Sequence, residues 1–217
     1  MHEHEFEPVP GLPERLPAGE HLLWQGSPDW RGIARRVFHL DLLALYFAAL
    51  IIWSGIDALR TIGIGGLVPA VVVPLTLSLG ALAMLGALAH LTARSAVYSI
   101  TTHRVVLRIG IVLSVTFNIP FRRIASADLR LFRDGSGDLA LTLGRSDHIG
   151  YLHLWPHARP WRMARPQPSL RSIPNAEQVA SVLAKAMLAA DPSVAIGTEP
   201  VNAEARSNGR PALATAR

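Results

Sequence analysis

Apolar residues fill two long stretches in the first part of the chain, and polar residues dominate the remainder. The first stretch, residues 37–59, reads VFHLDLLALYFAALIIWSGIDAL, and the second, residues 67–91, contains no Asp, Glu, Lys or Arg. About twenty apolar residues in a helix cross a hydrocarbon core of about 30 Å. The pattern therefore predicts two membrane-spanning helices. The alternative, a soluble helical bundle, would need a larger protein to bury two such stretches.

A short connection around residues 61–66, of about seven to ten residues, predicts an antiparallel hairpin. Pro69 falls in the first turn expected for the second helix, and Pro74 lies deeper, where it should kink the helix.

Basic residues flank the hairpin: Arg31, Arg35 and Arg36 precede it, and Arg94, Arg104 and Arg108 follow it. The positive-inside rule then predicts a multi-pass protein with both termini in the cytoplasm.

The pattern changes to a period of two after Arg94, which predicts strands. Candidate strands lie between residues 95 and 119 and at Ile124–Phe132, Leu139–Leu143, Tyr151–Leu154 and Leu170–Ile173. A final amphipathic helix presents one apolar face made of Val179, Val182, Leu183, Ala186 and Met187. We therefore expect an α+β membrane protein in which the transmembrane hairpin is followed by a small β-barrel or sandwich capped by a C-terminal helix.

The same pattern divides the chain into four parts. Residues 1–36 form a cytoplasmic N-terminal segment, and residues 37–92 form the hairpin. Residues 94–190 form the cytoplasmic β-domain, and the small polar residues of 191–217 predict a disordered tail.

Charge narrows the classes of partner. The chain has a formal net charge of +5 and no Cys, which excludes disulfides and thiolate chemistry. Residues 94–171 contain twelve Arg against four Asp. A domain with this balance beside a bilayer would be attracted to anionic lipid headgroups or to an acidic protein face. No nucleic-acid-binding motif is present, so we expect no nucleic-acid partner.

Candidate catalytic and metal-binding groups are few. Asp147, His148, His153 and His157 lie close in sequence, but their spacing matches no common zinc pattern. No Gly-x-Ser-x-Gly or comparable nucleophile motif occurs. We therefore expect neither a metal site nor an enzyme.

The second apolar stretch places small residues and one histidine on one helical face. These residues are Thr76, Gly80, Ala83, Ala87 and His90. Small residues allow another helix to approach closely, so this face predicts helix packing. The alternative is that His90 ligates the magnesium of a bacteriochlorophyll, because a neutral imidazole can be a metal ligand.

Residues 152–173, LHLWPHARPWRMARPQPSLRSI, combine tryptophans, arginines and prolines. Proline holds the backbone extended, and Trp with Arg is typical of interaction hot spots and membrane interfaces. The segment predicts a stiff basic-aromatic loop. The alternative is an ordinary solvated loop whose tryptophans pack on the β-domain.

LWPHARPWR, QPSLRSIP and the N-terminal run FEPVPGLPERLPAGEHLLWQGSPDW resemble the PuhB family, the photosynthetic complex assembly proteins of purple bacteria. YSITTHRVVLRIG, NIPFRRI and DGSGDLALTL resemble the broader bacterial pleckstrin-homology (PH)-like family. The resemblance implies a PH-like β-domain and a site in the bacterial inner, photosynthetic membrane. It also implies a signature loop that contacts partners: Trp155, Pro156, His157, Arg159, Pro160, Trp161, Arg162, Pro168, Leu170 and Arg171. The family usually has Met where Ser169 stands.

Three hypotheses of function follow. The resemblance implies a non-enzymatic assembly factor that scaffolds subunits of the reaction centre and the core light-harvesting antenna. The basic domain suggests instead a membrane-tethering module that binds anionic lipids. The third hypothesis is a pigment-carrying chaperone that uses His90, and a homo-oligomer is left open.

Overall fold

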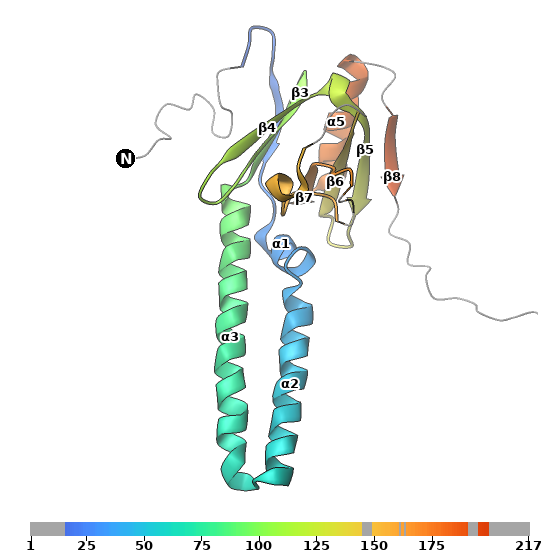
Figure 1. Cartoon of the computed structure of the whole chain (residues 1–217). Coiled ribbons are helices and arrows are strands. Elements are labelled where there is room, and N and C mark those ends of the chain that lie inside the picture. The colour runs from blue at the N-terminus through green and yellow to red at the C-terminus, as the bar shows by residue number, and fades with distance from the viewer. Residues whose placement is uncertain (1–15, 145–148, 161, 163, 191–194, 200–217) are drawn as a thin grey trace, which may run out of the picture.

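The computed structural model describes residues 16–144, 149–160, 162, 164–190 and 195–199. Two long helices, α2 (Leu40–Thr61) and α3 (Ile64–Ser95), run side by side away from a β-domain at one end (Figure 1). Only Ile62 and Gly63 connect them, and Gly63 has a φ of 82°, which suits glycine at a sharp reversal. The longer connection expected around residues 61–66 is therefore wrong, because its last three residues already belong to α3.

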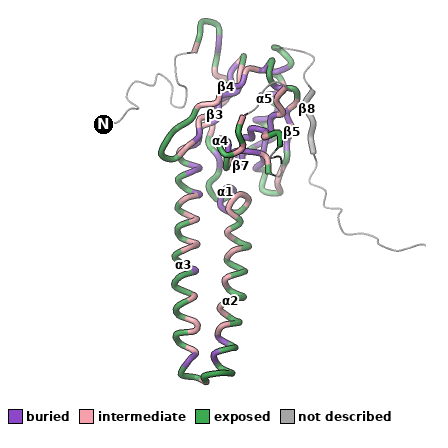
Figure 2. Tube along the Cα trace, viewed as in Figure 1, coloured by how far each residue is buried: buried purple, intermediate pink, exposed green. Residues whose placement is uncertain are grey.

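The hairpin exposes most of its apolar side chains (Figure 2). Trp53 is 75% exposed, Leu77 70% and Met84 69%. A water-soluble domain rarely exposes apolar surface on this scale. By length and composition, both helices are able to cross a membrane.

Glycines bring the two helices together. A side-chain carbon on Gly55 of α2 would lie 3.4 Å from Val71 of α3, and one on Gly86 of α3 would lie 3.7 Å from Leu40. Thr76, Gly80, Ala83 and Ala87, the face predicted for helix packing, are instead exposed, and nothing lies within 4 Å of such a carbon on Gly80. The hairpin therefore does not use this face for its own packing.

Two prolines lie inside α3, which runs on through both. Pro69 is in the second turn, not the first, because the helix begins at Ile64. Pro74 offers no N–H to the carbonyl of Ala70, four residues earlier. The hydroxyl of Ser54 in α2 donates to that carbonyl at 2.9 Å. Figure 1 shows no sharp bend in α3, so the expected kink is not observed. The neighbouring helix satisfies the acceptor that the proline leaves free.

The hairpin is an insertion within the β-domain. Strand β1 (Leu22–Gly26) and helix α1 (Trp30–Arg36) precede it, and β1 pairs antiparallel with β2 (Val97–Thr101), which follows it. The described part of the N-terminal segment, predicted to lie outside the domain, therefore supplies the domain's edge strand. Sequence periodicity could not reveal this pairing, because about seventy residues, most of them helical, separate the two strands.

Within the described part of the chain, eight strands form two sheets. The first has the order β1-β2-β3-β4, with β3 (Arg104–Ile109) and β4 (Val115–Pro120). A 3-10 turn, η1 (Phe121–Arg123), leads into the second, ordered β7-β6-β5-β8. Its strands are β5 (Ile124–Leu131), β6 (Gly137–Leu143), β7 (Ser169–Ile173) and β8 (Ala195–Glu199), which runs parallel to β5.

Both sheets and helix α5 (Ala176–Ala190) contribute to one core. Its largest fully buried side chains include Tyr98, Ile100, Leu107, Phe121, Leu139, Leu141, Leu170 and Leu183. The apolar positions of β5 break their alternation between Ile124 and Ala127, and the pairing register shifts between Ile124 and Ser126. The irregular pattern thus reflects a bulge that returns both side chains to the core.

Two local expectations are wrong. Tyr151–Leu154, a candidate strand, is the short helix α4, whose last two N–H groups bond back to the Gly150 carbonyl. β7 occupies the free edge of β6, so no position remains there for that strand. Strand β8 lies in the tail that was expected to be disordered, and the remaining residues of the tail lie outside the described residues.

Candidate functional site

The signature loop predicted to contact partners is fastened to the second sheet. The Arg159 N–H donates to Gln167 O at 2.9 Å, and the Ser169 N–H donates to His157 O at 2.8 Å. The loop thus folds back on itself, and Pro168 O accepts from the Leu141 N–H of β6 at 2.7 Å. The Trp155–Pro156 peptide bond at its start is cis. The prolines occupy turns and acceptor positions, where a missing N–H costs nothing.

His157 is buried and bonded to the first sheet. Its side chain is 1% exposed, and its Nδ1 lies 2.5 Å from the hydroxyl of Tyr98, which is fully buried in β2. Burial, reinforced by the charge of Arg171, lowers the pKa of His157 to about 3. Burial also raises the pKa of Tyr98 well above its ordinary value. The tyrosine therefore donates to a neutral imidazole, which carries its own proton on Nε2.

Arg171 is the charged centre of this buried network. Its Nη1 donates to Ala158 O at 3.0 Å, and its Nε lies 3.1 Å from Asp138 Oδ2 without pointing at that oxygen. The other carboxylate oxygen of Asp138 accepts from the Ser172 N–H at 2.8 Å. The Tyr98 hydroxyl accepts from the Arg171 N–H at 3.3 Å. The Arg171–Asp138 ion pair joins β7 to β6, and the hydrogen bonds around it reach the signature loop and β2 of the first sheet. Truncating either partner of the ion pair would leave a buried charge unpaired.

Arg159 is also held inside the domain. Its Nη1 donates to Asp128 Oδ2 at 2.7 Å and to Gln167 Oε1 at 3.2 Å, and the Gln167 amide in turn donates to Thr142. The side chains of Arg159 and Asp128 are 20% and 27% exposed. This arginine therefore orders the loop and offers little free charge to a partner.

The structure corrects the expectation that the whole signature loop faces a partner. His157, Pro168, Leu170 and Arg171 are buried, and Arg159 is largely enclosed. The exposed members are Trp155, Pro160 and Arg162, while Pro156 is half-buried and Trp161 lies outside the described residues. The Trp155 ring packs edge-on against Phe38 at 5.8 Å, immediately before α2. The exposed part of the loop therefore begins beside the base of the hairpin.

Helix α1 fixes the β-domain to the hairpin. Asp29 caps α1 by accepting from the Gly32 N–H at 3.0 Å, and its own N–H donates to Ser172 O at 2.8 Å. The buried residues Ile33 and Ala34 pack on Ala89 and Ala93 of α3. The end of α1 is attached as well: Arg36 donates to Ser136 at 2.7 Å and to Asp134 at 2.5 Å, and its guanidinium lies 3.7 Å from the centre of the Phe132 ring.

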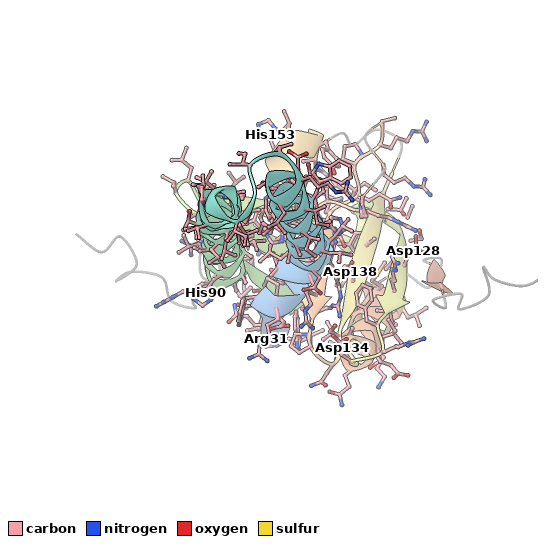
Figure 3. The ribbon with its side chains drawn as sticks, turned by 90° about the horizontal axis from the view of Figure 1, so that it is seen from below. Arg31, His90, Asp128, Asp134, Asp138 and His153 are labelled. Atoms are coloured by element: carbon pink, nitrogen blue, oxygen red, sulfur yellow. The ribbon has the colours of Figure 1, made fainter. Side chains whose placement is uncertain are left out.

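A hollow of about 360 Å³ lies against α1, and more arginine than aspartate side chains line it. Its lining residues are Asp29, Arg31, Gly32, Arg35, Arg36, Asp134, Ser136, Pro174 and Asn175. Hydrogen bonds from Ser136 lower the pKa of Asp134, and the neighbouring Arg36 lowers it further. Figure 3 shows Arg31 and Asp134 on the same side of the molecule. The composition suits an anionic group better than a cation.

The four residues weighed in the sequence as metal ligands are not brought together among the described residues. Asp147 and His148 lie outside them, His157 is committed to Tyr98, and His153 lies on the opposite side of the molecule from Arg31 (Figure 3). Across the described ranges, no three His, Asp or Glu side chains are grouped closely enough to hold a metal ion.

His90, the candidate pigment ligand, lies beside α1 and not in the middle of the hairpin. Its exposed ring contacts the Trp30 ring edge-on, with the ring centres 5.9 Å apart. The contact places the imidazole at the end of α3 nearest the β-domain.

The partners that hold the signature loop in place could not be identified from the sequence. Tyr98, Asp128 and Asp138 lie 59, 31 and 33 residues from the loop residues that they contact, and each falls within an ordinary strand pattern. Strand alternation places Asp138 on the face opposite the core residues Leu139 and Leu141, so the sequence pattern does not predict its burial.

Comparisons with known proteins agree with this architecture. The bacterial PH domain family matches residues 37–187, which include the hairpin and most of the β-domain. An uncharacterised 23.7 kDa protein encoded in the puhA 5′ region of Rhodobacter capsulatus is 42% identical over 188 residues, covering 85% of this chain and 87% of the relative. No solved structure matches significantly. On this family match and this relative, the chain belongs to the bacterial PH domain family.

Proposed function

We propose that this protein is a non-enzymatic, membrane-anchored assembly factor of the PuhB type, which scaffolds subunits of the photosynthetic reaction centre and its core antenna. The observation that carries the proposal is the 42% identical relative encoded beside puhA, a photosynthesis gene. The signature motifs of the loop support the same assignment. The buried Tyr98–His157–Arg171 network supports a structural use for the loop's polar groups.

The proposal places α2 and α3 across the inner, photosynthetic membrane, with the β-domain and both termini in the cytoplasm. Arg31, Arg35, Arg36 and Arg94 all lie near the end of the hairpin that carries the β-domain, whereas Arg60 alone lies near the other end. This asymmetry supports the orientation by the positive-inside rule.

Two surfaces would meet partner subunits. The small-residue face of α3, exposed and unused by α2, would admit a partner helix at close range. The exposed loop residues Trp155 and Arg162 would contact a cytoplasmic surface beside the base of the hairpin. A scaffold of this form needs neither a metal nor a bacteriochlorophyll, and we expect the purified protein to be colourless.

Deleting the gene in a phototrophic host tests the proposal. We expect reduced reaction-centre and core-antenna absorption in isolated membranes, restored by the wild-type gene. Trp155→Ala with Arg162→Ala should complement poorly, since truncating hot-spot residues commonly costs about 2 kcal/mol of binding energy. Arg122→Ala, an exposed arginine elsewhere on the domain, is the matched control. Normal absorption in the deletion strain would refute the assembly role.

The arginine-lined hollow beside α1 favours a second candidate, a tether that binds anionic lipids. Native mass spectrometry of the detergent-purified full chain distinguishes the two. Retention of anionic phospholipid that is lost in Arg31→Gln with Arg35→Gln, together with a normal deletion strain, would favour the tether. Retained pigment that is lost in His90→Ala would favour the chaperone instead.

A further inference from the structure

The turn between β3 and β4, residues 110–114, exposes consecutive apolar side chains. Val112 is 90% exposed and Leu113 82%, while Ile111 is 42% exposed. Gly110 makes the turn with a φ of 121°, and a side-chain carbon there would lie 2.1 Å from Leu113 O. The turn is therefore a defined structure that holds its apolar residues outward. We refer to residues 110–114 as the apolar tip.

Strand register places the apolar tip beside the end of the hairpin. α3 ends at Ser95, and β2 begins at Val97 and runs away from the helix. β3 returns antiparallel, so that Arg108 lies opposite Val97. The chain then continues past this pair into the apolar tip, which therefore points back towards the hairpin. Figure 1 shows the tip of the β3–β4 hairpin next to the upper end of α3.

The orientation of the apolar tip is fixed. α1 packs on α3 through Ile33 and Ala34. It is also bonded to β7 through Asp29 and to the turn between β5 and β6 through Arg36. A domain held at several points cannot turn freely about the helix ends. The apolar tip must therefore remain on the side from which the helices leave the domain.

Charge around the apolar tip fits a lipid surface. Arg94, in the last turn of α3, is exposed, and Arg108 stands at the base of the tip on β3. Arginine beside exposed aliphatic residues is the arrangement expected where apolar groups enter a bilayer and guanidinium groups remain among the phosphates. An acidic or purely polar surface would leave Val112 and Leu113 without apolar contacts.

We propose that the apolar tip inserts into the interfacial layer of the bilayer that α2 and α3 span, as a third point of membrane attachment. Val112 and Leu113 enter the layer between headgroups and acyl chains, while Arg94 contacts lipid phosphates. The β-domain then lies against the membrane surface and does not project freely into the cytoplasm. This inference rests on the proposed membrane insertion of the hairpin, and it is independent of any role in assembly.

The absence of Cys from the chain allows a direct test. Single variants Val112→Cys and Leu113→Cys of the full chain are labelled with an environment-sensitive fluorophore and reconstituted into phosphatidylcholine–phosphatidylglycerol vesicles that contain nitroxide lipids. Val72→Cys, on the exposed surface of α3, reports insertion of the hairpin. Arg122→Cys, exposed on η1 at the opposite end of β4, is the aqueous control.

We expect labels at residues 112 and 113 to be blue-shifted and quenched by shallow nitroxide lipids, several-fold more than the label at residue 122. Adding Leu113→Asp to Val112→Cys should reduce the quenching of the label at residue 112. Quenching at residue 72 with none at 112 or 113 would overturn the proposal while leaving the hairpin in the membrane. No quenching at residue 72 would overturn both the proposed insertion of the apolar tip and the proposed insertion of the hairpin. A defect in complex assembly has no effect on either signal.

Discussion

The Tyr98 hydroxyl is the group on which the buried polar network converges. It donates to His157 and accepts from the Arg171 N–H, within a core from which water is excluded. Removing the hydroxyl leaves both of these partners unsatisfied. In buried sites the cost of an unsatisfied group exceeds the net gain of making the bond.

We therefore expect Tyr98→Phe to lower the free energy of unfolding by about 1–3 kcal/mol. The measurement is thermal unfolding of the full chain in detergent, followed by tryptophan fluorescence. Tyr46→Phe removes the same hydroxyl from an exposed tyrosine on α2 and should change the midpoint little. Equal midpoints for the wild type and Tyr98→Phe would show that the network contributes nothing to stability.

His157 makes stability depend on pH. Its pKa is about 3 in the folded protein, against an ordinary value of 6.5. Above about pH 6.5 the imidazole is neutral in both states and the folded state bears no penalty. As pH falls from about 6.5 towards 3, only the unfolded chain takes up the proton, and the folded state loses at most about 1.4 kcal/mol per pH unit.

We expect the unfolding midpoint to fall between about pH 6.5 and pH 5, with part of that slope due to His157. His157→Gln keeps an acceptor for Tyr98 but cannot titrate, so its slope should be shallower. His153→Gln, at an exposed position, should keep the wild-type slope. A wild-type slope in His157→Gln would mean that other groups carry the pH dependence.

At the scale of elements, the α2–α3 contact depends on a proline and a serine that lie on different helices. Pro74 removes the N–H that would have bonded Ala70 O, and Ser54 supplies a hydroxyl to that carbonyl. Interhelical hydrogen bonds of this kind contribute about 0.6 kcal/mol on average within membranes and up to about 1.7. The contribution should be larger where the acceptor has no other donor.

A double-mutant cycle tests this dependence. Ser54→Ala should destabilise the hairpin by about 1 kcal/mol in the presence of Pro74. It should cost less in the Pro74→Ala background, because that substitution restores the backbone N–H that the helix lacks at this position. Unfolding of the full chain in mixed micelles, titrated with denaturing detergent, measures the four stabilities. Equal effects of Ser54→Ala in both backgrounds would show that the two residues act independently.

At the scale of the whole molecule, the hairpin interrupts the β-domain, so the domain is made of segments from both sides of it. β1 supplies an edge strand, and Glu20, just before it, forms a bidentate ion pair with Arg104 at 2.7 and 2.8 Å. Burial alone would raise the pKa of Glu20, but hydrogen bonds from Arg104 and Thr101 outweigh it and lower the pKa. The carboxylate is therefore charged at neutral pH.

We expect a fragment of residues 94–190 to be poorly folded, since it lacks β1, α1 and the partner of Arg104. Fusing residues 16–37 ahead of it through a flexible linker should restore cooperative unfolding, as measured by circular dichroism. Binding of a hydrophobic dye should be stronger in the shorter fragment. Identical cooperative transitions in the two fragments would contradict an essential role of β1.

The features that depend on local periodicity could be predicted from the sequence alone. Two apolar stretches gave two long helices, and a period of two after Arg94 gave strands with a C-terminal amphipathic helix. The basic character of the residues around the hairpin also follows from sequence alone. These features need no knowledge of which distant segments meet, because each is set by the burial or exposure of near neighbours.

Contacts between distant segments determine which residues of the signature loop are internal and where β1 lies. His157 lies in a segment whose sequence predicts a surface loop, yet the Tyr98 hydroxyl of a distant strand bonds it in the core. Arg171 is buried there as well, beside Asp138 of β6. β1 pairs across the whole hairpin, and the apolar tip gains its position from the register of β2 with β3. Such pairings depend on contacts between segments far apart in the chain, and they cannot be predicted from local periodicity.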